Sequence, residues 1–186
     1  MKHREYIEFL NVIEKLKCNT RHSWTSSGRH ESVAEHSWRL AMMAMLCKDE
    51  YPELDIDKVI KMCLIHDLGE AVTGDIPAFV KTQEDEQNEE NALLQLLSAL
   101  PEDMQKEFIA LFSEMNERKT PEAKLFKSLD NLEALISHNE ADISTWLPNE
   151  YELNLVYGKE NCEWSEWTRK LREQIKQDSI DKISKH

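Results

Sequence analysis

Apolar residues recur every three or four positions along most of the chain, the spacing of an amphipathic helix. Over residues 3–17 the pattern consists of Tyr6, Phe9, Leu10, Ile13 and Leu16. Ser32 and Glu35 have the spacing of a capping box, which predicts that a helix opens there and runs to about residue 50. The same periodicity predicts further helices from Asp55 or Asp57 to about Ala71, over 83–99, over 102–117, over about 121–142 and in a terminal segment beyond about 162.

Breaks in this pattern are few, because the chain has only 4 Gly and 5 Pro in 186 residues. The segments CNTRHSWTSSGRHES (18–32) and VTGDIPAF (72–79) are predicted to be loops from their Ser, Gly and Pro content. No segment alternates convincingly as a strand, so we expect an all-α fold. The length fits one domain. We expect a core over residues 1–145, then a linker and a C-terminal amphipathic helix over 146–186, packed on the core or on a partner subunit.

Composition narrows the class of partner and the compartment. The net charge of −13 argues against a nucleic-acid partner, which usually meets a basic surface. No apolar stretch approaches the roughly 20 residues that span a bilayer, so no membrane partner is expected. The cysteines are widely spaced and form no CxxC pair, which indicates free thiols and predicts a cytoplasmic protein: Cys18, Cys47, Cys63 and Cys162.

The segment CLIHDLGEAVTGDIP (63–77) places four metal-ligating side chain types within ten positions: His66, Asp67, Glu70 and Asp75. On a helix Glu70 would share a face with the histidine and aspartate that precede it. Buried carboxylates are costly unless they are compensated, and a bound cation is the obvious compensation.

Two other polar residues lie on otherwise apolar helix faces. His36 follows Val33 and precedes Leu40, and Asp130 lies between Leu129 and Leu132. Alone, each has an ordinary explanation, as a core histidine or as an acid that pairs with a nearby lysine. Together with the acidic segment they predict a metal site.

The segments ESVAEHSW, CLIHDLGEAVTGDIP and EAKLFKSLDNLEAL resemble the HD-domain metal-dependent phosphohydrolases, and most closely their small 5′-deoxynucleotidases. The resemblance covers about residues 5–142 and implies a single-domain HD-type helical bundle and a homodimer. It also implies a divalent ion on His36, His66, Asp67 and Asp130. Nitrogen and oxygen ligands suit Mn²⁺, Co²⁺, Fe²⁺, Ni²⁺ or Zn²⁺, among which the sequence does not choose. A second ion such as Mg²⁺ near Glu70 and Asp75 is left open.

The same resemblance points to the substrate side of the site. Arg21 has the position of an arginine that contacts phosphate in these enzymes, and Arg29 and Lys81 are further candidates. In some members an aromatic residue follows the arginine and helps to reject the ribose 2′-hydroxyl. Here His22 follows it, so Trp24 is the candidate for that role, and deoxyribose selectivity is open.

The function implied is hydrolysis of (deoxy)nucleoside 5′-monophosphates to nucleoside and phosphate. Glu70 and Asp75 would orient water and move a proton, or hold the second ion. The alternatives are an HD phosphohydrolase for a cyclic, oligomeric or polyphosphorylated nucleotide, a two-iron oxygenase of the same fold, or a non-catalytic nucleotide-binding module. The intact set of metal ligands favours catalysis over binding alone.

Overall fold

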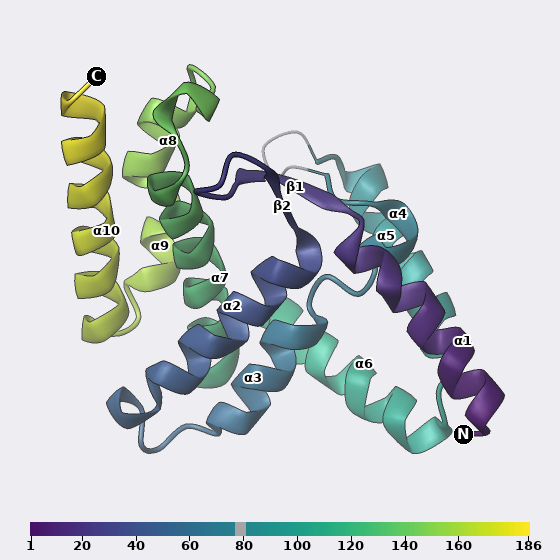
Figure 1. Ribbon diagram of the computed structural model, residues 1–186. Coiled ribbons are helices and arrows are strands. Elements are labelled where there is room, and N and C mark those ends of the chain that lie inside the picture. Colours follow the sequence, from purple (N-terminus) through teal and green to yellow (C-terminus); the bar gives the residue numbers. More distant parts are fainter. Residues whose placement is uncertain (77–80) are drawn as a thin grey trace.

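The computed structural model describes residues 1–76 and 81–186, and helices dominate it (Figure 1). This confirms the predicted all-α class. The elements are α1 (His3–Ile13), η1 (Glu14–Lys17), β1 (Thr20–Trp24), β2 (His30–Ser32), α2 (Val33–Leu46), η2 (Lys48–Glu50), α3 (Ile56–Ile65), α4 (Glu70–Thr73), α5 (Gln83–Leu97), α6 (Glu102–Glu117), α7 (Pro121–Glu140), η3 (Ile143–Thr145), α8 (Glu150–Val156), α9 (Lys159–Cys162) and α10 (Glu166–Ser184).

The core forms where α2, α3 and α7 pack against one another. Their inward faces carry buried aliphatic side chains, and removing this apolar surface from water is the main stabilising contribution. Helix α7 is the central element, because it also contacts α6, α9, α10 and β1. It begins where the Thr120 hydroxyl accepts a hydrogen bond from the backbone of Ala123, with Pro121 in the first turn.

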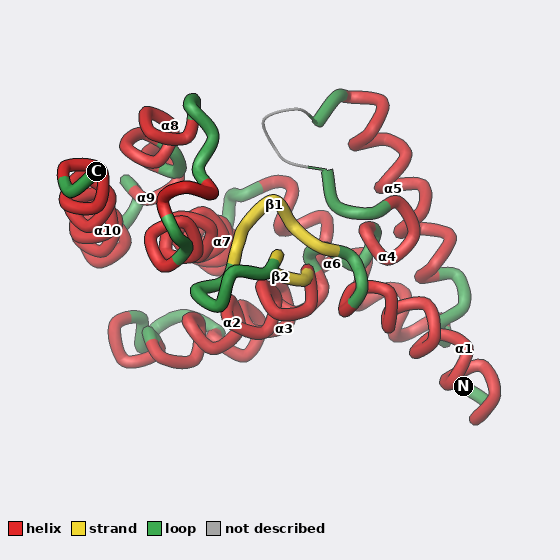
Figure 2. Tube along the Cα trace, turned by 45° about the horizontal axis from the view of Figure 1, so that its top comes forward, coloured by secondary structure: helices red, strands yellow, loops and turns green. Residues whose placement is uncertain are grey.

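The prediction of a loop without strands over residues 18–32 was wrong. Strands β1 and β2 pair antiparallel as a short hairpin (Figure 2). The tip turns where Gly28 adopts a φ of +82° and its N–H donates to the carbonyl of Thr25. The strands are short and polar, so they show little apolar alternation. The hairpin places β1 in contact with α7.

The predicted helix from residue 55 to 71 is interrupted in its last third. Helix α3 ends at Ile65, a turn follows, and α4 begins at Glu70. Across the turn the backbone N–H groups of Leu68 and Ala71 donate to the carbonyls three residues back, which tightens the chain. Gly69 lies in this turn against α5, where a Cβ would come 2.7 Å from Glu89 Cγ.

The segment after residue 145, predicted as linker and helix, also contains the short helices α8 and α9. Helix α10 packs against α7 and α8, and the Asn139 amide donates to the carbonyl of Ile175 at 3.0 Å. The predicted domain boundary at residue 145 stays a prediction. The chain termini lie at opposite sides of the molecule (Figure 1). Among the described residues, none of the helices has the length and apolarity needed to cross a membrane.

Candidate functional site

Three helical elements bring the four predicted metal ligands to one point. The capping box at Ser32 and Glu35 starts α2, so His36 follows within its first turn. His66 and Asp67 occupy the turn after α3, and Asp130 lies in the middle of α7. His36 Nε2 is 3.3 Å from both His66 Nε2 and Asp130 Oδ1, and His66 Nε2 is 3.0 Å from Asp67 Oδ2. Two nitrogens and two carboxylates therefore face one another.

Both histidines are oriented through contacts of Nδ1, the ring nitrogen that does not face the other predicted ligands. His66 Nδ1 donates to the carbonyl of Cys63 at 2.9 Å, one turn back on α3. His36 Nδ1 contacts the carboxylate of Glu133, and both of these side chains are fully buried. Histidines that bind metals in proteins are commonly held in this way, which leaves Nε2 for the ion.

The contacts at this point need a positive charge. With its proton on Nδ1, His66 turns the Nε2 lone pair toward Asp67 Oδ2, a buried oxygen that accepts no hydrogen bond from the described residues. Two lone pairs in contact repel each other unless a cation lies between them. The donor set, with two imidazoles and two carboxylates and no thiolate, fits a divalent transition metal.

The pKa shifts in the metal-free protein are consistent with a need for positive charge at this point. Burial and Arg21 both oppose a charge on His36, yet Asp130 and Glu133 raise its pKa to about 10. Burial would raise the pKa of Asp130, but Lys127 and the histidines hold it well below the usual range. The acids at this site therefore recruit protons and cations, and a divalent ion would supply that charge.

Glu70, which is buried, and Asp75, which is partly buried, are acids near Asp67. Burial, with Asp67 and Asp75, raises the pKa of Glu70 to about 9. Burial also raises the pKa of Asp75, although Arg21 opposes the shift. Glu70 Oε2 has no hydrogen-bond partner in residues 1–76 and 81–186. Such a pair suits either proton transfer or a second ion.

Arg21 extends from β1 to the same point. Its Nη1 lies 3.6 Å from Asp67 Oδ2, and its Nε lies 3.7 Å from Glu31 Oε2. Burial opposes its charge, but Asp67, with other acids of the site, raises its pKa above the usual value. The buried Nε donates no hydrogen bond to the described residues. A bound oxyanion could accept one.

A cavity of about 650 Å³ joins these groups. Its described lining includes the predicted residues Arg21, His66, Asp67, Glu70, Asp75, Lys81 and Asp130. Lys81 pairs with Glu89 there. Trp24 and Arg29 are not among the described lining residues. The Trp24 ring packs on His30 with centroids 4.0 Å apart, and Arg29 pairs with Glu35 at 2.6 Å on the outer face.

Two acids of this site were missed in the sequence. Glu133 follows Asp130 by three positions on α7 and lies among buried leucines, so the helical period that singled out Asp130 also marks it. Glu31 is buried on β2 and reaches Arg21 only because the hairpin forms, so no local signal marks it.

Comparison with known proteins shows the family of the chain. A family model described as "HD domain" matches residues 13–172. The chain is 38% identical over 141 residues to the 5′-deoxynucleotidase HDDC2 of Bos taurus, covering 74% of this chain and 68% of that protein. It is 31% identical over 170 residues to the 5′-deoxynucleotidase hdd1 of Schizosaccharomyces pombe, covering 82% and 85%.

Solved structures agree as well. The crystal structure of a "predicted metal-dependent phosphohydrolase" from Magnetospirillum magnetotacticum superposes with a TM-score of 0.81 at 29% identity, over 96% of this chain and 93% of that one. A conserved hypothetical protein from Pyrococcus furiosus superposes with a TM-score of 0.70 at 31% identity, over 94% and 99%. The chain therefore belongs to the HD-domain family, as its motifs had suggested.

Proposed function

We propose that this chain is a metal-dependent phosphohydrolase that converts (deoxy)nucleoside 5′-monophosphates into nucleoside and phosphate. The observation that carries the proposal is the meeting of His36, His66, Asp67 and Asp130 beside a cavity. Arg21 and the last three of these residues line that cavity, and His36 lies buried behind them. The 5′-deoxynucleotidase relatives support the substrate class.

The four ligands hold one divalent ion, and their chemistry suits Mn²⁺, Co²⁺, Fe²⁺, Ni²⁺ or Zn²⁺. When bound, such an ion polarises a phosphate oxygen and lowers the pKa of a coordinated water. Glu133 and the Cys63 carbonyl hold the two imidazoles so that each presents Nε2 to the ion.

The chain's own residues position the phosphate and the water. Arg21 binds phosphate oxygens through its planar guanidinium and stabilises the charge of the transferring group. Its ion-pair partners, Asp67 and Glu31, lie 3.6 and 3.7 Å away, too far for a hydrogen bond, so the guanidinium would keep donors for a phosphate. Glu70 and Asp75 orient the attacking water and accept its proton. A second, harder ion such as Mg²⁺ on the same two acids is the alternative.

Discrimination between deoxyribose and ribose is less strict here than in relatives that have an aromatic residue after the arginine. His22 has that position here, and Trp24 packs on His30 instead of lining the described cavity wall. We therefore expect weak discrimination against ribonucleotides.

The test is phosphate release from paired deoxyribo- and ribonucleoside 5′-monophosphates. Metal-stripped protein is resupplied with Mn²⁺, Co²⁺, Mg²⁺ or Zn²⁺, alongside Asp67→Asn and the control Asp57→Asn, an exposed aspartate on α3. Release that returns with metal, is lost in Asp67→Asn and persists in Asp57→Asn supports the proposal. Absence of release from every monophosphate by metal-loaded protein would refute it and redirect the search to diesters or polyphosphorylated nucleotides.

A homodimer and a cytoplasmic location stay predictions. Trp38, Met45 and Leu46 are exposed on α2 and give that helix an apolar outer surface. Sedimentation equilibrium of the protein and of Trp38→Glu measures whether a dimer exists and whether it uses this face.

A further inference from the structure

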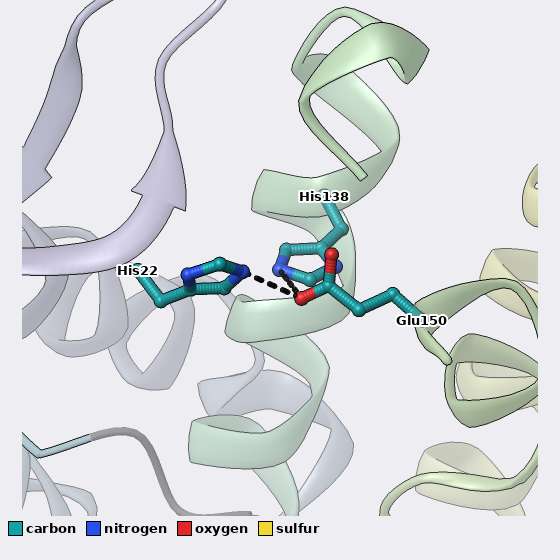
Figure 3. A group of neighbouring side chains, drawn as sticks. All are labelled: His22, His138 and Glu150. Carbon is teal, nitrogen blue, oxygen red and sulfur yellow. Dashed lines mark ion pairs between the residues drawn. The ribbon is translucent and has the colours of Figure 1, made fainter. Parts of the chain in front are cut away.

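A second group of metal-ligating side chains lies at another part of the cavity wall. It consists of His22 from β1, His138 from the last turns of α7 and Glu150 from the first turn of α8 (Figure 3). Both imidazoles turn Nε2 toward the same carboxylate oxygen. Glu150 Oε1 lies 2.8 Å from His22 Nε2 and 3.7 Å from His138 Nε2. All three side chains line the cavity.

Packing does not account for the charge of Glu150. The residue is 1% exposed, and its Oε2 accepts a hydrogen bond from the backbone of Leu147 at 2.6 Å. Its other oxygen, Oε1, is buried and receives no hydrogen bond of normal geometry from the described residues, and its ion pairs with the two imidazoles compensate its charge only when an imidazole is protonated. A buried carboxylate oxygen of this kind is costly unless a cation compensates it.

The dimensions fit a tetrahedral ion. Zinc bonds to histidine nitrogen and to carboxylate oxygen are about 2.0–2.2 Å long, which places two ligand atoms of a tetrahedron roughly 3.3–3.5 Å apart. The separations of 2.8 and 3.7 Å from Glu150 Oε1 bracket this value. The three ligand atoms lie within 4.8 Å of one another, so small side-chain rotations would bring them around one ion.

We propose that His22, His138 and Glu150 form a second transition-metal site, which takes Zn²⁺ or an ion of similar chemistry and keeps a coordination position open to the cavity. Two histidines and one glutamate with an open position are the ligands of many zinc sites with bound water. The site is separate from the first one. His138 follows Asp130 by eight positions on α7, about 12 Å along the helix axis, whereas paired ions that act together lie about 3.5–4 Å apart.

An ion pair between His22 and Glu150 without metal is the competing explanation. In it, His138 contributes no hydrogen bond to the carboxylate, because 3.7 Å is too long for one, and it contacts the pair only as a neighbouring ring and charge. The two explanations therefore differ in what removal of His138 does to the metal content.

The experiment is a count of bound zinc. Protein stripped with a chelator is dialysed against Zn²⁺, passed through a desalting column and measured by plasma mass spectrometry. We expect His138→Ala and Glu150→Gln each to hold one ion fewer per chain than the unaltered protein. His3→Ala, which removes an exposed histidine on α1, should hold as many as the unaltered protein. Circular dichroism establishes that each variant is folded.

The zinc content also tests the second site independently of the proposed phosphohydrolase function. Asp67→Asn lowers the content at the first site, and adding His138→Ala should remove a further ion. If phosphate release fails while this difference persists, the second site stands alone. Equal zinc contents in folded His138→Ala, folded Glu150→Gln and the unaltered protein would overturn it. Loss of the tetrahedral Co²⁺ absorption band in His138→Ala would support it independently.

Discussion

The Glu133 carboxylate holds Nδ1 of His36 across 97 positions of sequence, and both side chains are fully buried. Glu133 in turn accepts a hydrogen bond from Arg39 Nε at 2.7 Å. Burial would raise the pKa of Glu133, but His36 and Arg39 lower it to about 2. The carboxylate is therefore ionised, and it fixes the imidazole with Nε2 toward His66 and Asp130.

Glu133→Gln should weaken binding of the divalent ion about 10–100-fold, the usual effect of removing the partner of a ligating histidine. Because Glu133 only positions a ligand, phosphate release should return when metal is added in excess. Competition with a chelating dye measures the affinity. Glu140→Gln is the matched control, since Glu140 also pairs with Arg39 but is exposed. Equal affinities in the two folded variants would contradict the positioning role.

Arg21→Lys should lower kcat/KM for nucleoside monophosphates by roughly 10–100-fold, because a lysine cannot reproduce charge-assisted hydrogen bonds worth about 1.5–3 kcal/mol. The metal content should not change, since Arg21 is no ligand. Steady-state kinetics and metal analysis on one preparation measure both. Arg169→Lys, on the exposed face of α10, serves as the control. Unchanged kcat/KM in Arg21→Lys would remove the arginine from the proposed mechanism.

Much of the fold was predictable because helices carry local signals. The capping box at Ser32 and Glu35 and the proline at 121 start α2 and α7 where predicted, and these helices carry His36 and Asp130. Both residues stood out because a charged or polar side chain on an apolar helix face is unusual. Local pattern therefore marked them as candidates, and the resemblance to the HD-domain enzymes assigned them to one predicted metal centre.

Features that depend on tertiary contacts were not predictable in this way. The β1–β2 hairpin forms from polar residues with no apolar alternation, so the positions of Trp24 and Arg29 could not be foreseen. The group of His22, His138 and Glu150 comes from three elements that are distant in sequence. No spacing along the chain reveals such a group, and only the packing of β1 and α8 beside α7 assembles it.

Gly158→Ala should destabilise the fold by more than Gly28→Ala does. Both glycines have a positive φ, +69° and +82°, which costs an L residue roughly 1–2 kcal/mol. At Gly28 a Cβ meets nothing within 4 Å, whereas at Gly158 it would lie 2.7 Å from Asn131 Cβ. Asn131 cannot move freely, because its amide is bonded to Tyr157 and Asn161.

Overpacking of this kind costs typically about 1–3 kcal/mol beyond the backbone strain. Urea unfolding of the two variants and the parent measures the difference in free energy of unfolding. Equal losses in both variants would show that Asn131 yields to the added methyl group.

The stability of the metal-free protein should fall as the pH rises, because Glu70 takes up its proton far more readily when folded. Its pKa is about 9 in the fold against an ordinary value of 4.5, chiefly through burial and then through Asp67 and Asp75. Between these values the folded state binds more protons than the unfolded state, so the free energy of unfolding decreases with rising pH.

Glu70→Gln has no such proton to lose, so its free energy of unfolding should decline less steeply with pH. Thermal unfolding of chelator-treated protein from about pH 5 to about pH 9 measures the slopes. Glu53→Gln, which removes an exposed carboxylate, should follow the parent. Because Asp75 and Glu31 also have raised pKa values, some slope should remain in Glu70→Gln, but a slope equal to the parent's would mean that Glu70 is already ionised in the fold.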